Sequence, residues 1–194
     1  MKLLLGSQSP RRKELLAGLG CTFECRTADT EETYPDSLQG EEIPIYLSRL
    51  KADALRNTLH DNELLITADT IVWHKDEVLG KPHDAEDAIR MLRSLSGETH
   101  KVITGVTLTS WQTQSSFASM TEVRFSQLTE EEINYYVKRF MPLDKAGAYG
   151  IQEWIGYIGV EHINGSYFNV MGLPVQRLYQ ELKKWGVQPG TFEK

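Results

Sequence analysis

The stretch LLLGSQSPRRKELL, residues 3–16, indicates a strand that turns directly into a helix. Three leucines are typical of a short buried strand, and the Gly-Ser-Gln that follows is a turn. Ser9 is a favoured N-cap residue, and Pro10 is favoured at the first position of a helix. The pattern therefore predicts a helix from Pro10 to about Leu19, in a strand–helix unit typical of α/β proteins.

The first turn of this helix carries two arginines, Arg11 and Arg12, where the helix dipole disfavours cations by roughly 0.3–1 kcal/mol each. One interpretation is that both are solvated and simply tolerated. The other is that an anion binds at the helix N-terminus, where free N–H groups and the arginines would hold phosphate oxygens, with hydroxyl help from Ser7. Neither standard glycine-rich phosphate motif is present. The local pattern leaves both readings open.

Working outward, strands and helices alternate, with more strands than a pure βαβ repeat would contain, so we expect a mixed sheet. Helical spacing and cap residues predict helices over 42–59, from Asp84 to Gly97, from the Thr129–Glu132 capping box to about 139, and from Pro174 to Trp185. Strands are predicted over 64–70, ending at Asp69-Thr70, in a hairpin over 71–80, over 101–111 and 119–128, and on both sides of an Asn164-Gly165 turn.

Composition indicates one soluble domain, or one domain with two lobes. The chain has 194 residues, is 40% hydrophobic and 25% charged, and has a net charge of −6. The acidic balance argues against a nucleic-acid polymer as partner, and no apolar run approaches the ~20 residues that span a bilayer. We therefore expect a cytoplasmic protein with no membrane partner. Cys21 and Cys25 make neither a disulfide framework nor a zinc site.

Several charged residues are candidates for chemistry, each with an ordinary alternative. Asp69 stands where an apolar strand is predicted to end, which suits a metal ligand or a general base, but also a turn cap. Lys51 adjoins the apolar stripe of its helix, and Lys81 lies in a turn; each alone is also typical of a surface lysine. Glu32 lies in an acidic loop, where a solvated side chain is common.

The segment DKAGAYGIQ, residues 144–152, has Gly147 and Gly150 on either side of Tyr149. Glycines let a backbone approach a ligand closely, and the Gln152 amide can hydrogen-bond a base edge. An ordinary turn would have the same composition.

Taken in order, these segments resemble the Maf family of nucleotide pyrophosphatases. The resemblance lies in SQSPRRKELL (7–16), ADT (68–70), LGKP (79–82), LSGETHKVITG (95–105), DKAGAYGIQ (144–152) and GSYFNVMGLP (165–174). It implies a single domain over 1–187 with two lobes, followed by a short tail, 188–194. The implied fold is an elongated mixed sheet flanked by helices with a cleft between the lobes, similar to the inosine triphosphate pyrophosphatases.

The resemblance also implies an activity and a set of site residues. The reaction is hydrolysis of a nucleoside triphosphate to the monophosphate and pyrophosphate, with a divalent metal, Mg²⁺ or Mn²⁺, and a homodimer is expected from the family. The implied roles are catalytic acid/base for Asp69, substrate binding for Ser7, Arg11, Arg12, Lys51 and Lys81, and metal binding for Glu32 with Asp69.

Positions 12, 70 and 152 mark the branches of the family, and Arg12, Thr70 and Gln152 match the branch that acts on dTTP and UTP. A side-chain amide suits a pyrimidine edge because it donates and accepts together. Two alternatives stay open at this stage. One is action on 7-methyl-GTP or another modified nucleotide, and the other is a nucleotide-binding regulator of septum formation without turnover.

Overall fold

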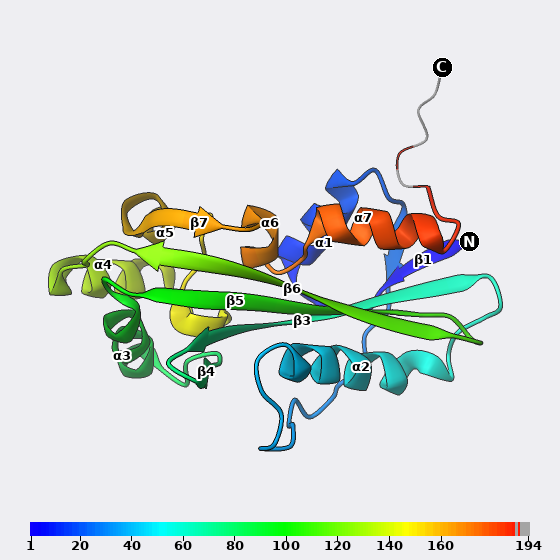
Figure 1. Ribbon diagram of the computed structural model, residues 1–194, viewed down its shortest axis with the longest axis horizontal. Coiled ribbons are helices and arrows are strands. Elements are labelled where there is room, and N and C mark those ends of the chain that lie inside the picture. The colour runs from blue at the N-terminus through cyan, green and yellow to red at the C-terminus, as the bar shows by residue number, and fades with distance from the viewer. Residues whose placement is uncertain (189, 191–194) are drawn as a thin grey trace. The chain divides into compact units, whose positions relative to one another are not determined.

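The computed structural model of the chain describes residues 1–188 and 190. Its strands are β1 (Lys2–Leu5), β2 (Phe23–Cys25), β3 (Glu63–His74), β4 (Glu77–Leu79), β5 (Thr99–Thr109), β6 (Gln114–Phe125) and β7 (Val160–Asn164). Its helices are α1 (Pro10–Gly18), α2 (Glu42–Arg56), α3 (Ala85–Leu95), α4 (Glu130–Phe140), the 3-10 turn η1 (Ala146–Ala148), α5 (Trp154–Gly159), α6 (Tyr167–Val170) and α7 (Val175–Lys184) (Figure 1).

The described strands form one seven-stranded sheet in the order β2-β1-β3-β5-β6-β7, with β4 paired to β3. β1 runs parallel to both β2 and β3, whereas β3 with β4 and β6 with β7 are antiparallel pairs. The mixed α/β sheet expected from the sequence is therefore confirmed.

The chain forms two compact units. The first comprises residues 1–69, 104–119 and 172–194, within the described part of the chain, and the second comprises 70–103 and 120–171. The single domain predicted over 1–187 stays a prediction, and residues 189 and 191–194 of the expected tail lie outside the described residues.

In the first unit, α1 and α7 lie on one face of the strands and α2 on the other (Figure 1). The apolar side of α2 packs on β1 and β3 through a buried cluster: Leu4, Ala52, Leu55, Leu59 and Leu65. Gly105 of β5 allows a close approach of α2, because a Cβ there would lie 2.3 Å from the Pro44 carbonyl carbon. Pro44 is in the first turn of α2, where a missing N–H removes no helical hydrogen bond.

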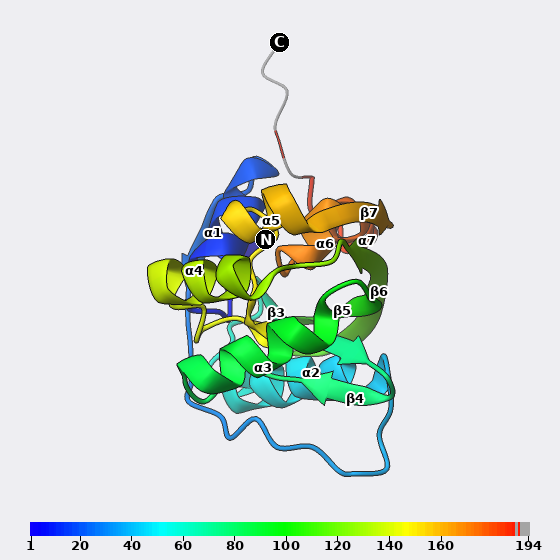
Figure 2. The same ribbon diagram turned by 90° about the vertical axis from the view of Figure 1, so that its left-hand side faces the viewer.

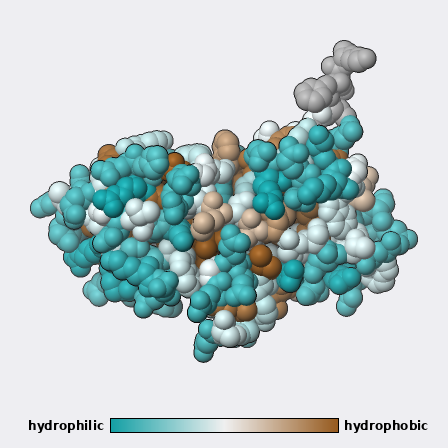
Figure 3. Space-filling model, viewed as in Figure 1, coloured by the Kyte–Doolittle hydropathy of each residue, from teal (hydrophilic) through white to brown (hydrophobic). Residues whose placement is uncertain are grey.

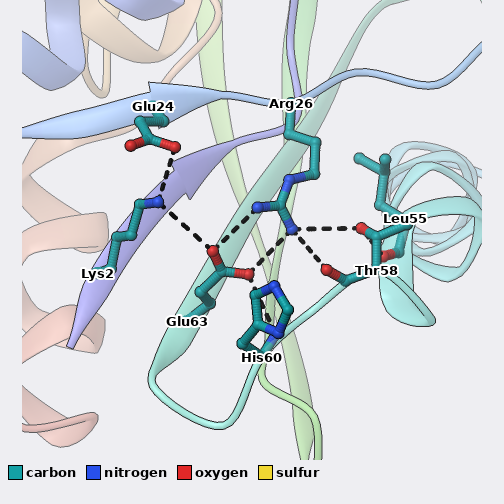
Figure 4. Close-up of polar contacts among 7 residues, drawn as sticks. All are labelled: Lys2, Glu24, Arg26, Leu55, Thr58, His60 and Glu63. Atoms are coloured by element: carbon teal, nitrogen blue, oxygen red, sulfur yellow. Dashed lines mark hydrogen bonds and ion pairs between the residues drawn. The ribbon is translucent and has the colours of Figure 1, made fainter.

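A cluster of polar contacts surrounds the buried Glu63 side chain in the first unit (Figure 4). The Glu63 side chain is 3% exposed and accepts two hydrogen bonds from Arg26, each of 2.9 Å. Lys2 Nζ lies 3.7 Å from the same carboxylate, and the His60 backbone N–H donates to it at 3.1 Å. Arg26 also donates to the Thr58 carbonyl oxygen at 2.7 Å. The cluster therefore ties the ends of β1, β2 and α2 to the first residue of β3.

In the second unit, α3 packs beside α4 (Figure 2). Asp84 caps α3 by accepting from the Asp87 N–H, and Thr129 forms with Glu132 the predicted capping box of α4. The core between the helices and the strands includes the fully buried Phe125. The caps predicted for α3 and α4 are therefore confirmed.

Three local expectations were wrong. β3 does not end at Asp69-Thr70 but continues to His74, so Asp69 lies inside a strand. Ser9 precedes α1 as predicted, but its side chain makes no cap hydrogen bond. The Asn164-Gly165 pair does not join two strands: β7 ends at Asn164, and Ser166 caps the short helix α6. A Cβ at Gly165 would lie 2.7 Å from Thr121 Oγ1, so this glycine serves a close contact with β6.

The face shown in Figure 3 carries mostly hydrophilic residues. Within the part of the chain that is described, no helix has the length and apolar character needed to cross a membrane.

His100 is expected to make the protein acid-sensitive. Its ring is 2% exposed, and Nε2 lies 2.7 Å from the Tyr149 hydroxyl. Burial, reinforced by nearby His74, lowers the pKa of His100 from 6.5 to about 3. Between these values the unfolded chain binds a proton that the native protein does not, so the free energy of unfolding falls as the pH drops below 6.5. The slope reaches about 1.4 kcal/mol per pH unit.

Urea unfolding at pH 7, 6 and 5 measures this slope, and His100→Gln serves as the comparison because glutamine does not titrate. Equal slopes in the two proteins over this range would contradict the assignment. This range of pH 5–7 lies above 4.5, the pKa of Glu63 in the unfolded chain. In the folded protein the pKa of Glu63 is lower still, chiefly because of the Arg26 hydrogen bonds. Stability contributed by Glu63 is therefore lost only at lower pH.

Candidate functional site

The N-terminus of α1 has no acidic residue in its first turn and no side-chain cap from Ser9. Instead, the oxygen of Ser7 accepts from the Ser9 backbone N–H at 3.2 Å and from Arg12 Nη1 at 3.4 Å. A serine hydroxyl has two acceptor lone pairs and one hydrogen. Because two N–H groups donate to its oxygen, the Ser7 side chain is held in place, and its own O–H stays available as a donor at this helix end.

The Arg12 side chain, from the first turn of α1, is held by a backbone carbonyl and interacts electrostatically with both candidate carboxylates, Asp69 and Glu32. Its Nε donates to the Gly172 carbonyl oxygen at 2.8 Å. Burial lowers the pKa of the Arg12 guanidinium, Asp69 and Glu32 oppose that change, and Arg11 adds to it. An arginine in a protein nevertheless stays protonated. The first unit therefore holds a partly buried cation next to two carboxylates and a second arginine.

Lys51 joins the two carboxylates. Its Nζ lies 2.5 Å from Asp69 Oδ1 and 2.9 Å from Glu32 Oε1. The Lys51 and Asp69 side chains are 16% and 10% exposed, whereas that of Glu32 is 44% exposed. α2 supplies the lysine, the interior of β3 supplies Asp69, and the segment between β2 and α2 supplies Glu32.

Six predicted site residues of the first unit therefore gather in one neighbourhood: Ser7, Arg11, Arg12, Glu32, Lys51 and Asp69. Three cations and a hydroxyl donor suit a polyanion such as a phosphate chain. The Lys51 and Asp69 side chains are largely buried, which strengthens the charge interaction between them. The arrangement can bind phosphate oxygens and place the Asp69 carboxylate near them.

The two carboxylates also fit a divalent cation. Mg²⁺ is commonly held by one or two carboxylates together with waters and substrate phosphates, rather than by a complete protein cage. Asp69 and Glu32 converge on one positive group, which is the place a cation would take. The described residues gather no set of three or more His, Cys, Asp or Glu side chains that could hold a metal ion.

The other predicted site residues belong to the second unit. Thr70 follows Asp69 within β3, and Lys81 is exposed two residues after β4. Gly80, beside Lys81, accepts from the Gly147 N–H at 3.1 Å, so the LGKP and DKAGAYGIQ segments are joined. The Gln152 Oε1 atom is buried and, among the described residues, has no hydrogen-bond partner. A buried acceptor without a partner is rare in native proteins.

Comparison with known proteins assigns the family. The model of the family described as Maf-like protein matches residues 2–185. The chain belongs to the Maf family. The resemblance stated from the sequence motifs is thereby confirmed over nearly the whole chain.

Two relatives of this Maf protein carry the same name. A dTTP/UTP pyrophosphatase of Phocaeicola vulgatus is 62% identical over 184 residues, covering 94% of this chain and 95% of the relative. A dTTP/UTP pyrophosphatase of Parabacteroides distasonis is 57% identical, with the same coverage. Among solved structures, the Ham1 protein of Staphylococcus aureus is similar in fold, with a TM-score of 0.55, 15% identity and coverage of 96% of this chain and 100% of that one.

Residues outside the sequence motifs support the Maf segment 144–152. Tyr136 of α4 is fully buried, and its hydroxyl lies between the Gly150 N–H and the Glu153 carboxylate. Lys145, 8% exposed, pairs with the same carboxylate at 3.1 Å. Nothing in the local pattern around Tyr136 signals this contact, because its partners lie 14 and 17 residues away.

Proposed function

We propose that the protein is a nucleoside triphosphate pyrophosphatase that hydrolyses dTTP and UTP to the nucleoside monophosphate and pyrophosphate. The family and the names of relatives 57–62% identical over 94% of the chain support this activity. The observation that carries the chemistry is the buried Asp69 carboxylate, held by Lys51 and lying in the field of Arg12.

The phosphate chain is proposed to bind at the N-terminus of α1. Arg11 and Arg12 are unfavourable beside the helix dipole on their own, and a triphosphate reverses that balance. The oriented Ser7 hydroxyl donates to a phosphate oxygen, and Lys51 and Lys81 add positive charge. These cations offset the charge that develops on the departing pyrophosphate.

Asp69 is proposed to act on the attacking water. Its carboxylate orients the water and takes its proton while the bond between the α and β phosphates breaks and pyrophosphate leaves with the bonding electrons. Lys51 fixes one oxygen of the carboxylate by a 2.5 Å contact, so the carboxylate is held in one orientation. A fixed acceptor needs little reorganisation during the reaction.

Glu32 and Asp69 are proposed to hold Mg²⁺ or Mn²⁺ together with the substrate's phosphates. The bound ion supplies neutralisation of phosphate charge, as divalent metals do in phosphoryl transfer. In the geometry described above, Lys51 lies between the same two carboxylates and so balances their charge.

Base recognition is assigned to Gln152, with Arg12 and Thr70 as further specificity residues. The unpartnered Gln152 Oε1 supports this role, because uracil and thymine both offer an N–H donor at N3. The extra methyl of thymine is worth about 1–3 kcal/mol at most, so we expect weak discrimination between dTTP and UTP.

The test is to incubate the purified protein with a panel of nucleoside triphosphates and Mg²⁺ or Mn²⁺, and to measure pyrophosphate and monophosphate. We expect turnover of dTTP and UTP to exceed that of the purine nucleotides, with pyrophosphate rather than single phosphate released. Preference for 7-methyl-GTP would keep the reaction and overturn the assignment of Arg12, Thr70 and Gln152. Binding without turnover of any nucleotide would favour the regulator of septum formation instead.

The proposal also includes an assembly and a location. A homodimer is proposed from the family, and light scattering of the purified protein measures the mass that tests it. The proposed substrates are those of the cytoplasmic nucleotide pool, and cell fractionation tests that location.

A further inference from the structure

Gln152 lies in a four-residue turn, residues 150–153, whose ends are closed by a backbone hydrogen bond. The Glu153 N–H donates to the Gly150 carbonyl oxygen at 2.9 Å. Because this hydrogen bond closes the four residues into one turn, the inner side chains move together with the ends of the turn. The contacts at the ends of the turn therefore decide where the Gln152 amide lies.

One phenol holds both ends. The Tyr136 hydroxyl accepts from the Gly150 N–H at 3.1 Å and donates to Glu153 Oε2. Burial, and then the Glu153 carboxylate, raise the pKa of Tyr136, so its hydroxyl keeps the proton that it donates. Because α4 carries Tyr136 and the turn is a separate segment, this hydroxyl is a direct tie between the helix and the turn.

A second contact fixes the other oxygen of the same carboxylate. Lys145 Nζ lies 3.1 Å from Glu153 Oε1 and 2.7 Å from Asp144 Oδ1. The pair lies directly on the turn, since a Cβ at Gly150 would be 2.9 Å from Glu153 Cδ and 3.1 Å from Lys145 Cε. Glycine at position 150 thus allows the carboxylate and the ammonium to lie against the backbone.

We propose that Tyr136 is a positioning residue for base selectivity: its hydroxyl fixes the turn that directs the Gln152 amide at the pyrimidine, without touching the substrate itself. The inference rests on the proposed function. Uracil presents an N–H at N3 beside a carbonyl at C4, whereas cytosine presents an acceptor beside an amino group. A fixed amide distinguishes these two patterns, and an amide free to turn over fits both.

The experiment compares kcat and KM for UTP and CTP in the wild type and in Tyr136→Phe, which keeps the ring and removes only the hydroxyl. We expect the ratio of kcat/KM for UTP over CTP to fall about tenfold, mainly through a higher KM for UTP. Tyr135→Phe is the matched control, because Tyr135 is the adjacent residue of α4, is 49% exposed, and contacts Trp154 only through its ring. Its ratio should be unchanged.

A merely structural role for Tyr136 predicts a different result. Loss of folded enzyme lowers kcat equally for both nucleotides and leaves the ratio intact, and that outcome would overturn the proposal. A double-mutant cycle with Gln152→Ala separates the roles further. If Tyr136 acts through Gln152, adding Tyr136→Phe to Gln152→Ala does not change the ratio, whereas independent, multiplying losses would contradict the inference.

The wild-type measurement distinguishes this proposal from the proposed function. Turnover of neither UTP nor CTP by the unmodified protein would overturn the proposed function itself. Turnover with an unchanged ratio in Tyr136→Phe would overturn only the positioning role. If Tyr136→Phe does not fold, Glu153→Gln, which keeps the side-chain size but loses the charged acceptor, carries the same expected tenfold fall.

Discussion

Asp69→Asn is expected to lower kcat for dTTP by about 10²–10⁴-fold, the usual contribution of a general acid or base. Asparagine keeps the size of the side chain and still accepts from Lys51, but it cannot take a proton from water. The loss should therefore appear in pyrophosphate release at saturating nucleotide, with the thermal unfolding midpoint little changed. A coupled pyrophosphate assay and a melting curve on the same preparation measure both quantities.

The control for this change is Asp53→Asn. Asp53 lies in α2, two residues after Lys51, and accepts at 3.1 Å from Gln114 in the same unit. Its loss of charge should leave kcat near the wild-type value. If Asp69→Asn retained turnover within threefold of wild type, Asp69 would have no part in activating water.

Arg26→Met is expected to lower the free energy of unfolding by about 3 kcal/mol, because it leaves the buried Glu63 carboxylate without its main partner. Methionine keeps most of the apolar stem, so the change isolates the lost charge. The expected fall in the unfolding midpoint is about 6–12 °C for a chain of this size. Chemical unfolding and calorimetry at pH 7 measure the two values.

The matched control is Arg93→Met. Arg93 makes the same two-pronged contact with Glu130, at 2.6 and 2.7 Å, but both side chains are more than half exposed. Solvent screens such a pair, so its loss should change stability little. Equal destabilisation by the two variants would show that burial of Glu63 is not what makes the Arg26 contact strong.

The features that could be predicted from sequence are those set by neighbours within a few residues. The Asp84 cap of α3 and the Thr129–Glu132 capping box involve partners three residues apart, and both were predicted. Asp69 misled the strand prediction, because an aspartate is normally unfavourable inside a strand. Here Lys51, 18 residues away, supplies the compensating charge that lets β3 continue past it.

The candidate site shows the same limit. Arg11 and Arg12 were conspicuous because they oppose the local helix field, but the field alone could not separate a solvated pair from an anion site. Only the family resemblance connected them with Asp69, since no spacing rule relates residues so far apart. Neither the local pattern nor the family motifs single out Tyr136. It has the pattern of an ordinary core residue of an amphipathic helix, and its role depends on where a distant turn lies.

Asp69 and Glu32 both contact Lys51, but they come from different kinds of backbone segment. Asp69 is inside a twelve-residue strand, whereas Glu32 lies between β2 and α2, in a stretch without helix or strand. Ordering a backbone residue costs roughly 1–2 kcal/mol of conformational entropy. The strand has met that cost during folding, before any ligand arrives. Glu32 is placed against Lys51 at 2.9 Å by a segment outside the sheet, so loss of Lys51 would let Glu32 move while β3 still held Asp69 in place.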